Sequence, residues 1–595
     1  MRKNNHPFLF YPLGFVLMLG LIVFSPAVFA SSISKAVAKA TGLNEEYDPH
    51  AKVFSETAYP SAQQCASCHQ KIYDEWSSSN HAYASISPMF HKFDQTINDL
   101  SQGTVGNFCM RCHSGVGSAM GEKREAPLWD RKPVAREGVT CISCHRVNEE
   151  YGKVNGERRI VPGDIHQPVY GPTNGDVLKE VIKNKSFHKI ATDPTERGTK
   201  IHAQAIQFKT IDQSEFCMSC HQVAVHPGIK LEVVWEQYRA SPAMKKGTTC
   251  IACHMGKTPG IAGEFEKGPA AILNDQPINP ERKHANHAFY GPGYPTAHPG
   301  IFPQNPDNEH FKMEEWLKFD YRSGWGSKDF EDKVESGSDK VDFPSEWSDR
   351  SDREEARQII DANLKRLEEK RELRLQVMEN GSKIEGPFIK GSPRAGKKLR
   401  FVYKLTNTNP GHNLPSGSLG AQPEIWLNVA LIDPDGKNVW ESGYVDSSGD
   451  MADLHSLDVH AGKIAHDKQL FNLQTKFLTT NVKGTDREMY LPVNFDVDQL
   501  PFIRPANVPT SVMNHPPFIR MEAKSIPPLG NRKARYSVPG KLLTKPGKYK
   551  LSVRLRSRAE PIYFMKFCRA TTEMEEAMNQ WMLDIHPSTV EFEVK

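Results

Sequence analysis

Apolar and polar positions alternate with a period of two along the C-terminal third of the chain, from about residue 385. The alternation is clearest in the runs 401–405, 425–431, 549–555 and 590–594, and Asp433-Pro-Asp-Gly436 supplies a turn after the second run. Short alternating runs of this kind are typical of half-buried strands. They predict an antiparallel β-sandwich of immunoglobulin-like type over residues 385–595, a domain that is usually structural or a docking surface. Within it, the proline-rich stretch 456–535 matches no element.

The preceding residues have helical spacing instead. Ser351-Asp-Arg-Glu354 has the form of a capping box, so a long helix is predicted to follow to about Asn380, with Gly381 as its end. One face of this helix carries an apolar stripe, formed by Ala356, Ile360, Leu364, Leu367, Leu375 and Met378. Because Arg371 interrupts the stripe, we expect packing against the preceding domain rather than a coiled coil. Residues 325–350 are rich in Ser, Gly, Asp and Glu and predict an exposed linker, so 326–384 is assigned to a linker and a long helix.

The N-terminus has the pattern of a secretion signal. Arg2 and Lys3 precede an apolar run from Phe8 to Phe24, and small residues then lead to Ala30. This order predicts a signal peptide over residues 1–30. The alternative is an uncleaved membrane anchor, which is disfavoured because Pro12 and Pro26 make a poor membrane-spanning helix. Both interpretations place the rest of the chain outside the cytoplasm, in the periplasm or at the cell surface.

Composition narrows the class of protein. The chain has 595 residues, of which 38% are hydrophobic and 25% charged, so it is neither a polytopic membrane protein nor a disordered chain. A net charge of +4, from 75 basic and 71 acidic residues, gives no sign of a nucleic-acid partner. The unusual counts are 11 cysteines and 23 histidines.

Ten of the cysteines belong to five copies of the motif Cys-x-x-Cys-His. The copies are Cys65, Cys68 and His69; Cys109, Cys112 and His113; Cys141, Cys144 and His145; Cys217, Cys220 and His221; and Cys250, Cys253 and His254. Two thiols at this spacing can add to the two vinyl groups of one haem, and the following imidazole then becomes an axial ligand of the iron. A zinc site or a redox disulfide also uses paired cysteines, but neither requires the histidine. The motifs therefore predict five covalently attached haem c groups, and Cys568, in an apolar stretch, is expected to be an inert buried thiol.

Five haems also explain how residues 45–325 can fold with few long apolar segments, because each haem is a large apolar plate that serves as core. The predicted fold class is therefore α+β and multidomain. A mainly helical, loop-rich pentahaem cytochrome domain over 45–325 is followed by the long helix and the immunoglobulin-like β-sandwich.

Two of the motifs are repeated with their flanking residues. Phe108-Cys-Met-Arg-Cys-His113 matches Phe216-Cys-Met-Ser-Cys-His221, and Gly138-Val-Thr-Cys-Ile-Ser-Cys-His145 matches Gly247-Thr-Thr-Cys-Ile-Ala-Cys-His254. The similar separation within each pair indicates a duplicated two-haem unit with closely packed haems. With these residues, and with Tyr73, Trp76, Ser79 and His81-Ala82 after the first motif, the chain resembles the multihaem cytochromes of the cytochrome c-554 and hydroxylamine oxidoreductase type. The resemblance covers roughly residues 55–300 and, more loosely, the C-terminal domain.

Each iron has a second axial position, for which the chain offers many histidines. The resemblance implies that His81, His188 and His287 are distal ligands, with His284 as the nearby rival of His287. His412 lies in a Gly/Pro-rich loop that could reach from the second domain to a haem. His166, His202 and His226 compete for the remaining place, and Met244 and Met255 are weaker candidates. His455, His460 and His466 are expected to lie in a solvated loop rather than to form a metal cluster, since their spacing fits no helix face.

These features favour an electron carrier that passes electrons between redox partner proteins, either other cytochromes or a membrane quinone-linked complex. The alternative is a multihaem oxidoreductase acting on a small nitrogen or sulfur oxyanion at one open iron. The resemblance includes pentahaem nitrite reductases, which replace one motif histidine by lysine, but all five motifs here end in histidine. A third possibility, an oligomer or haem filament, concerns the partners and not the chemistry.

Overall fold

The structure is a computed structural model that describes residues 59–101, 103, 106–149, 154–225, 229–278, 280–417, 423–454, 456–474, 476–480, 489–490, 518–522 and 524–595. The predicted signal peptide, residues 1–30, lies outside the described residues. So do His226, His455 and most of the stretch 475–523, which belongs to the region in which no element was predicted.

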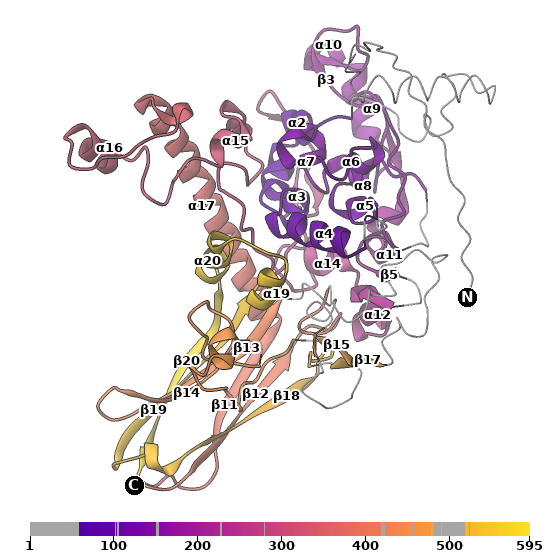
Figure 1. Ribbon diagram of the computed structural model, residues 1–595. Helices are drawn as coiled ribbons and strands as arrows, with labels where there is room; N and C mark the ends of the chain where they lie inside the picture. The colour runs from indigo at the N-terminus through magenta and orange to yellow at the C-terminus, as the bar shows by residue number, and fades with distance from the viewer. Residues whose placement is uncertain are drawn as a thin grey trace, which may run out of the picture. The chain divides into compact units, whose positions relative to one another are not determined.

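The first half of the described chain consists of short helices joined by long loops (Figure 1). The helices are α2 (Ala62–Ser77), α3 (Asn80–Tyr83), α4 (Pro88–Ser101), α5 (Met110–His113), α6 (Gly115–Ala119), α7 (Pro133–Arg136), α8 (Cys141–His145), α9 (Asp176–Lys183), α10 (Lys185–His188), α11 (Ser214–Met218), α12 (Val234–Arg239), α13 (Pro242–Lys245) and α14 (Cys250–His254). Every Cys-x-x-Cys-His motif overlaps one of them, namely α2, α5, α8, α11 or α14. The helical and loop-rich character predicted for this region is confirmed.

Short strands pair within the same region. The parallel pairs are β1 (Val169–Gly171) with β4 (Ala205–Gln207) and β2 (Ile190–Ala191) with β3 (Thr199–Lys200). The antiparallel pairs are β5 (Val223–Val225) with β6 (Ile229–Glu232), β7 (Glu266–Gly268) with β10 (Arg282–His284), and β8 (Ile272–Leu273) with β9 (Gln276–Pro277). A two-stranded ladder is marginal alone, so these pairs fix loops between the motifs and do not form a core.

Helix α2 carries the first motif and is held at both ends. Ser61 and Gln64 form a capping box at its start. The buried Glu137 carboxylate accepts the Ala62 N–H at 2.9 Å and 3.1 Å, which ties this start to the loop before the third motif. At the other end, the buried indole of Trp76 donates to the carbonyl of Val139 at 2.9 Å. These bonds place the first and third motifs side by side.

Residues 316–347 contain a buried aromatic cluster, where composition had predicted an exposed linker over 325–350. Trp316, Phe319, Trp325 and Trp347 are all buried, with Trp347 fully enclosed. α15 (Met313–Trp316) ends at the start of this segment, and α16 (Lys328–Glu335) lies within it. The predicted exposure does not hold at Trp325 and Trp347, because irregularly spaced aromatic side chains supply a core here and give no periodic signal, whereas the bounds of the linker stay a prediction.

A buried ion pair, Arg353 with Glu331, lies beside this cluster. Arg353 donates to both carboxylate oxygens of Glu331, at 2.9 Å and 2.5 Å, and also to the carbonyl of Trp347 at 2.7 Å. Both side chains are almost fully buried. We expect Arg353→Met to lower the free energy of unfolding by about 3–5 kcal/mol, because it leaves the Glu331 charge buried without a partner.

Thermal unfolding of the holoprotein measures this effect. The matched control is Arg350→Met, which removes an arginine that pairs with Glu335 and Glu354 on the surface. It should cost about 0–1 kcal/mol, as exposed pairs do. Equal losses for the two variants would contradict the assignment.

The predicted long helix is α17 (Arg350–Asn380), of 31 residues. Gly381 ends it as predicted, but Asp349 and not Ser351 caps its start, since the Asp349 carboxylate accepts the Ser351 N–H at 2.7 Å. Its apolar stripe is buried or half-buried, and the predicted packing against the preceding region is confirmed by bonds from Arg366 to the backbone and side chains of α2. Among the described helices, neither α17 nor any other is both long and apolar enough to cross a membrane.

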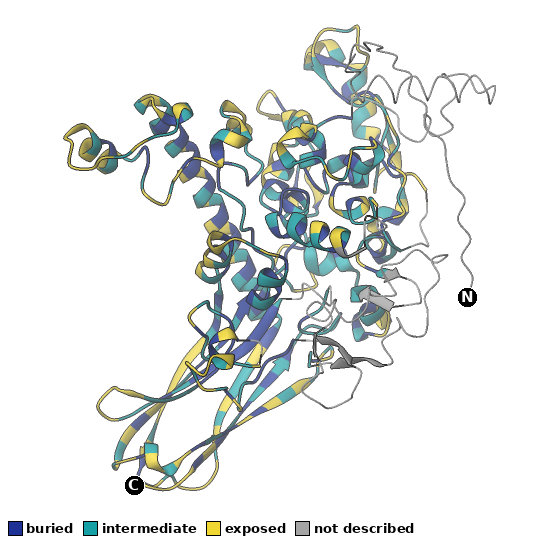
Figure 2. Cartoon of the chain, viewed as in Figure 1, coloured by how far each residue is buried: buried dark blue, intermediate teal, exposed yellow. Residues whose placement is uncertain are grey.

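The C-terminal region contains two antiparallel sheets with a common core (Figures 1 and 2). One has the order β14 (Asn438–Ser442), β13 (Glu424–Ile432), β19 (Gly547–Arg558), β20 (Leu583–Val594). The other has the order β11 (Ser382–Ile389), β12 (Leu399–Asn407), β18 (Asn531–Val538). A third, small sheet consists of β16 (Met489–Tyr490), β15 (Lys476–Thr480) and β17 (Phe518–Glu522), and α18 (Leu457–His460) lies between β14 and β15. The four predicted strands are confirmed as β12, β13, β19 and β20, and the immunoglobulin-like topology stays a prediction.

Two helices between β19 and β20 pack back onto the helical half of the chain. They are α19 (Ile562–Phe567) and α20 (Thr572–Gln580). Phe564 and Met565 share one apolar cluster with Tyr73 and Trp76 of α2. Cys568 lies in the same cluster, and burial raises the pKa of its thiol to about 12, which agrees with the predicted inert thiol.

Candidate haem sites

Four of the five motif histidines are anchored in the same way. The Nδ1 atoms of His69, His113, His145 and His254 lie 2.7, 3.2, 2.9 and 2.6 Å from the backbone carbonyls of Ala270, Ala84, Tyr170 and Tyr290. A carbonyl can only accept, so Nδ1 must carry the proton and Nε2 must carry the lone pair. This bond fixes the tautomer and the ring orientation that a metal-binding histidine needs.

The motif cysteines are available as thiols. None of the eleven cysteines forms a disulfide, and the ten motif cysteines are half-buried whereas Cys568 is buried. Thiols of different motifs are close neighbours in three pairs: Cys65 with Cys141, Cys112 with Cys220, and Cys217 with Cys250. The first motif therefore adjoins the third, and the fourth adjoins both the second and the fifth.

A second histidine faces two of the motif histidines at a distance that suits iron. The ring centroids of His81 and His221 are 6.2 Å apart, and those of His254 and His412 are 6.0 Å apart. Two metal–imidazole bonds of about 2 Å each, plus about 1.2 Å from each nitrogen to its ring centre, span about 6 Å. Nδ1 of His81 is a buried nitrogen without a hydrogen-bond partner in the described part of the chain, so no hydrogen bond from this atom fixes the ring.

Two further motif histidines have a second histidine as an electrostatic neighbour. Burial, followed by the charge of His145, lowers the pKa of His287 to about 3. Burial, followed by the charge of His69, lowers the pKa of His202 to about 4. Nδ1 of His287 lies 2.7 Å from the carbonyl of Ala285, and the backbone N–H of His287 donates to the Glu75 carboxylate. The ring nitrogen left for a metal is therefore Nε2.

All four of these second histidines are neutral at pH 7. Burial, followed by His221, lowers the pKa of His81 to about 3, and burial, followed by His254, lowers the pKa of His412 to about 4. Only the neutral imidazole can bind a metal. Sequence reasoning predicted His81, His287 and His412 and left His202 among the competitors, because no local motif marks it.

His188 occupies a different kind of position. It ends α10, and the ring contact described for it is with the exposed Phe187, at 5.1 Å. No ring contact joins it to a motif histidine in the described ranges, and its role as a ligand stays a prediction.

The other candidates mostly have partners of their own. Nε2 of His284 lies 2.7 Å from a Glu75 carboxylate oxygen, and Nδ1 of His166 lies 3.2 Å from the Ile201 carbonyl. His460 is exposed and bonds the carbonyl of Leu454, and Met244 is largely exposed. These contacts favour His287 over His284 as the ligand on the third motif.

His202 and His188 can be separated by substitution. We expect His202→Ala to convert the haem of the first motif from low-spin to high-spin, because the side chain beside His69 is removed. His188→Ala, the matched control, should leave the number of low-spin haems unchanged. Low-temperature EPR of the oxidised proteins counts these haems, and the reverse pattern would show that the ligand predicted from sequence is the right one.

His113 of the second motif has a different environment. The ring of Phe90 stacks on it at 4.1 Å, with 8° between the planes. His91 is an electrostatic neighbour of His113, and its Nε2 lies 2.6 Å from the Ser85 carbonyl. The ion pair of Arg124 with Asp94, at 3.0 Å, lies close by, and Asp94 also bonds Cys109. In the part of the chain described, the second motif is thus the one whose histidine neighbour, His91, has its Nε2 on a backbone carbonyl.

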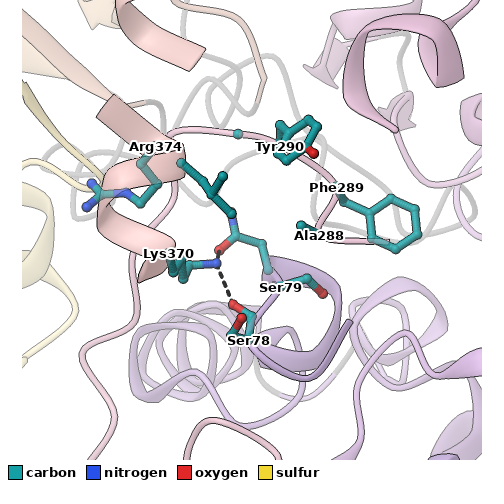
Figure 3. Close-up of a pocket in the computed structure, with 10 residues that line it drawn as sticks. Ser78, Ser79, Ala288, Phe289, Tyr290, Lys370 and Arg374 are labelled. Atoms are coloured by element: carbon teal, nitrogen blue, oxygen red, sulfur yellow. Dashed lines mark hydrogen bonds between the residues drawn. The ribbon is translucent and has the colours of Figure 1, made fainter. Parts of the chain in front are cut away.

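Helix α17 positions the segment that carries His81. Nζ of Lys370 donates to the carbonyl of Ser78 at 2.8 Å and to Oδ1 of Asn80 at 2.9 Å (Figure 3). Ser79 then caps α3 by accepting the Ala82 N–H at 3.2 Å. The pocket in Figure 3 lies between this segment and Phe289, whose ring is 4.1 Å from that of His81. The long helix therefore has a direct structural link to a candidate ligand.

His412 reaches the fifth motif from the loop between β12 and β13. This loop is tied to the helical half by the bond from the Ala243 N–H to the Pro410 carbonyl, at 3.1 Å, and by Asn413, whose N–H donates to Gln237 at 3.1 Å. The amide of Asn409 lies 3.1 Å from Nε2 of His412, so it must move aside before that nitrogen can bind a metal.

The residues present fit haem c. Each motif provides two thiols and a histidine, four motif histidines have Nε2 free as an acceptor, and four have a neutral second histidine beside them. Each haem would be held by its two cysteines and its motif histidine, with His202, His287, His81 and His412 as second ligands for the first, third, fourth and fifth motifs.

Comparison with known proteins supports haem attachment for part of the chain. Residues 64–146, which hold the first three motifs, match the family model described as cytochrome c554 and c-prime. No curated protein matches the chain. A solved structure of Pseudomonas fluorescens alkylpurine DNA glycosylase AlkC, bound to DNA containing an abasic site analog, matches at 12% identity with a TM-score of 0.13. That match covers 40% of this chain and 38% of the other, and at this TM-score it carries no structural argument. The family match supports a c-type cytochrome, with covalently bound haem and a role in electron transfer.

Proposed function

We propose that the protein is an exported pentahaem c-type cytochrome that transfers electrons between redox partners through closely packed haems. The observation that carries this proposal is the pair of ring contacts, His81 with His221 and His412 with His254, each at a separation that suits an iron between the two rings. When bound, haem supplies a one-electron ferric/ferrous couple at each site.

The protein side chains define what these sites can do. A histidine on each side of an iron closes both axial positions, so no substrate can bind there. Two imidazole ligands also favour lower reduction potentials than a histidine–methionine pair. The contacts between thiols of different motifs support close packing of the attached haems, which a path for electrons requires.

The partners and location follow from the same reasoning. The signal sequence predicted over residues 1–30 supports the periplasm or the cell surface. Other cytochromes, or a membrane quinone-linked complex, would load and unload electrons, and an oligomer or filament would extend the path. The C-terminal sheets would serve as a structural or docking domain.

Low-temperature EPR of the oxidised holoprotein tests the proposal. We expect the four haems with paired histidines to be low-spin and inert to added ligands. High-spin signals from two or more haems would contradict it, since at least one assigned pair would then be wrong.

A second candidate function rests on His113. Because Nε2 of His91, the histidine neighbour of His113, is held by the Ser85 carbonyl, the iron of the second motif could keep an open position, near Arg124 and Arg131. The protein would then be a multihaem oxidoreductase acting on a small nitrogen or sulfur oxyanion. A single high-spin haem whose spectrum changes with nitrite or hydroxylamine would favour this function, and five low-spin haems would exclude it.

A further inference from the structure

The loop after the third motif lies at the junction of three haem-attachment motifs. The N–H groups of Asn155 and Gly156 donate to the carbonyls of Gln222 and Ser219, at 3.2 Å and 2.6 Å, beside the fourth motif. Gly156 has a φ of +68°, and a Cβ there would come within 2.7 Å of Sγ of Cys112, in the second motif. Only glycine allows so close an approach in this conformation. The loop is therefore fitted to these motifs.

Arg158 extends from this loop into the junction. Its Nη1 donates to Sγ of Cys144, in the third motif, at 3.9 Å. Its Nε donates to the hydroxyl of Ser219, inside the fourth motif, and its Nη2 donates to the Phe216 carbonyl. The guanidinium also lies over the Phe216 ring, 4.2 Å from its centroid. The side chain thus bridges the third and fourth motifs.

This positive charge has no acidic counterpart. In the described ranges no carboxylate forms an ion pair with Arg158, and its polar partners are a hydroxyl, a carbonyl and a sulfur. Once haem is attached, the cysteine sulfurs are thioethers and carry no charge either. Arg158 is half-buried, so water screens its charge less than that of an exposed arginine, and a nearby positive charge favours the reduced form of a redox centre.

The junction is also central among the motifs. The third motif adjoins the first through Cys141 and Cys65. The fourth adjoins the second through Cys220 and Cys112, and the fifth through Cys217 and Cys250. Among these contacts, the third and fourth motifs form the link between the first motif and the second and fifth.

We propose that Arg158 is a built-in positive charge that raises the reduction potentials of the haems at the third and fourth motifs. This proposal rests on the proposed function, because it requires the haems. It makes the junction the place where an electron resides longest as it crosses the protein. Arg158 acts electrostatically on these two sites and is not a ligand.

Redox titration of the holoprotein, followed by absorbance and EPR, tests the proposal. We expect Arg158→Gln to lower two of the five midpoint potentials and Arg158→Lys to leave them close to their original values, because lysine retains the charge. Arg159→Gln is the matched control, since the neighbouring Arg159 is 79% exposed and its charge is screened by water. It should change none of the potentials.

Two variants of Ser219 test the same proposal if Arg158→Gln does not fold. Ser219→Asp places a negative charge against the retained arginine and should lower the same two potentials, whereas Ser219→Asn should not. Unchanged potentials in Arg158→Gln or Ser219→Asp proteins that retain five haems would overturn the proposal. So would equal shifts in Arg158→Gln and Arg158→Lys. The haem count, measured by mass on the same samples, separates these results from a failure of the proposed function.

Discussion

Replacing His412 by alanine is expected to convert one of the five haems, that of the fifth motif, from low-spin to high-spin. The His412 ring lies 6.0 Å from that of His254, with 16° between their planes, and the described loop offers no second histidine in its place. The loop itself should stay in position, because its bonds to Ala243 and Gln237 involve Pro410 and Asn413. The open iron should then bind added ligands such as cyanide or nitrite. EPR and absorbance spectra of the oxidised holoprotein measure both effects.

Two further variants sharpen this prediction. His412→Met should restore a low-spin haem and raise its potential, since methionine is a weaker donor to ferric iron than imidazole. His466→Ala removes another histidine of the C-terminal region and is the matched control, which should leave all the spectra unchanged. An unchanged low-spin count in His412→Ala would show that the second domain supplies no ligand, whatever the distance between the rings.

Replacing Cys217 and Cys220 together by serine is expected to have the largest effect on stability. The fourth motif adjoins the second and fifth motifs directly and the third through Arg158. Loss of its haem removes an apolar plate from the middle of the helical region. The cost should exceed the about 3–5 kcal/mol that follows truncation of a single buried Phe or Trp. Denaturing mass spectrometry should show one haem fewer, and thermal unfolding should begin at a markedly lower temperature.

Two variants serve as controls, one in the first motif and one at Cys568, which lies outside the motifs. Cys65→Ser with Cys68→Ser should also remove one haem but destabilise the protein less, because the thiol contacts in the described residues link the first motif to the third alone. Cys568→Ser should retain all five haems, since this buried thiol lies outside every motif. Equal losses of stability for the two double variants would contradict the central place of the fourth motif.

The elements that sequence could predict are those with a local pattern. Strands β12, β13 and β19 alternate apolar and polar residues, and α17 has a helical stripe that ends at Gly381, so each was placed to within a few residues. The cluster around Trp316 and Trp347 could not be predicted, because its members are far apart in sequence and meet only through tertiary packing.

The candidate site residues also fall into those that a local sequence pattern marks and those that only the folded structure reveals. The motif cysteines and histidines are defined by spacing, and His412 was marked by an unusual loop. His202 was not marked, because its pairing with His69 depends on how two distant segments fold together, whereas His188 fitted a family pattern and has no described contact with a motif histidine. The role of Arg158 depends on three motifs that meet in space, which no local pattern encodes.

Denaturing mass spectrometry of the intact, purified holoprotein tests the central claim most directly. Covalent haem survives denaturation, whereas bound zinc and non-covalent cofactors do not. The arrangement of the motifs predicts a mass equal to that of the polypeptide plus five haems. A mass equal to that of the polypeptide alone, or to that of a polypeptide with fewer haems than motifs, would contradict it.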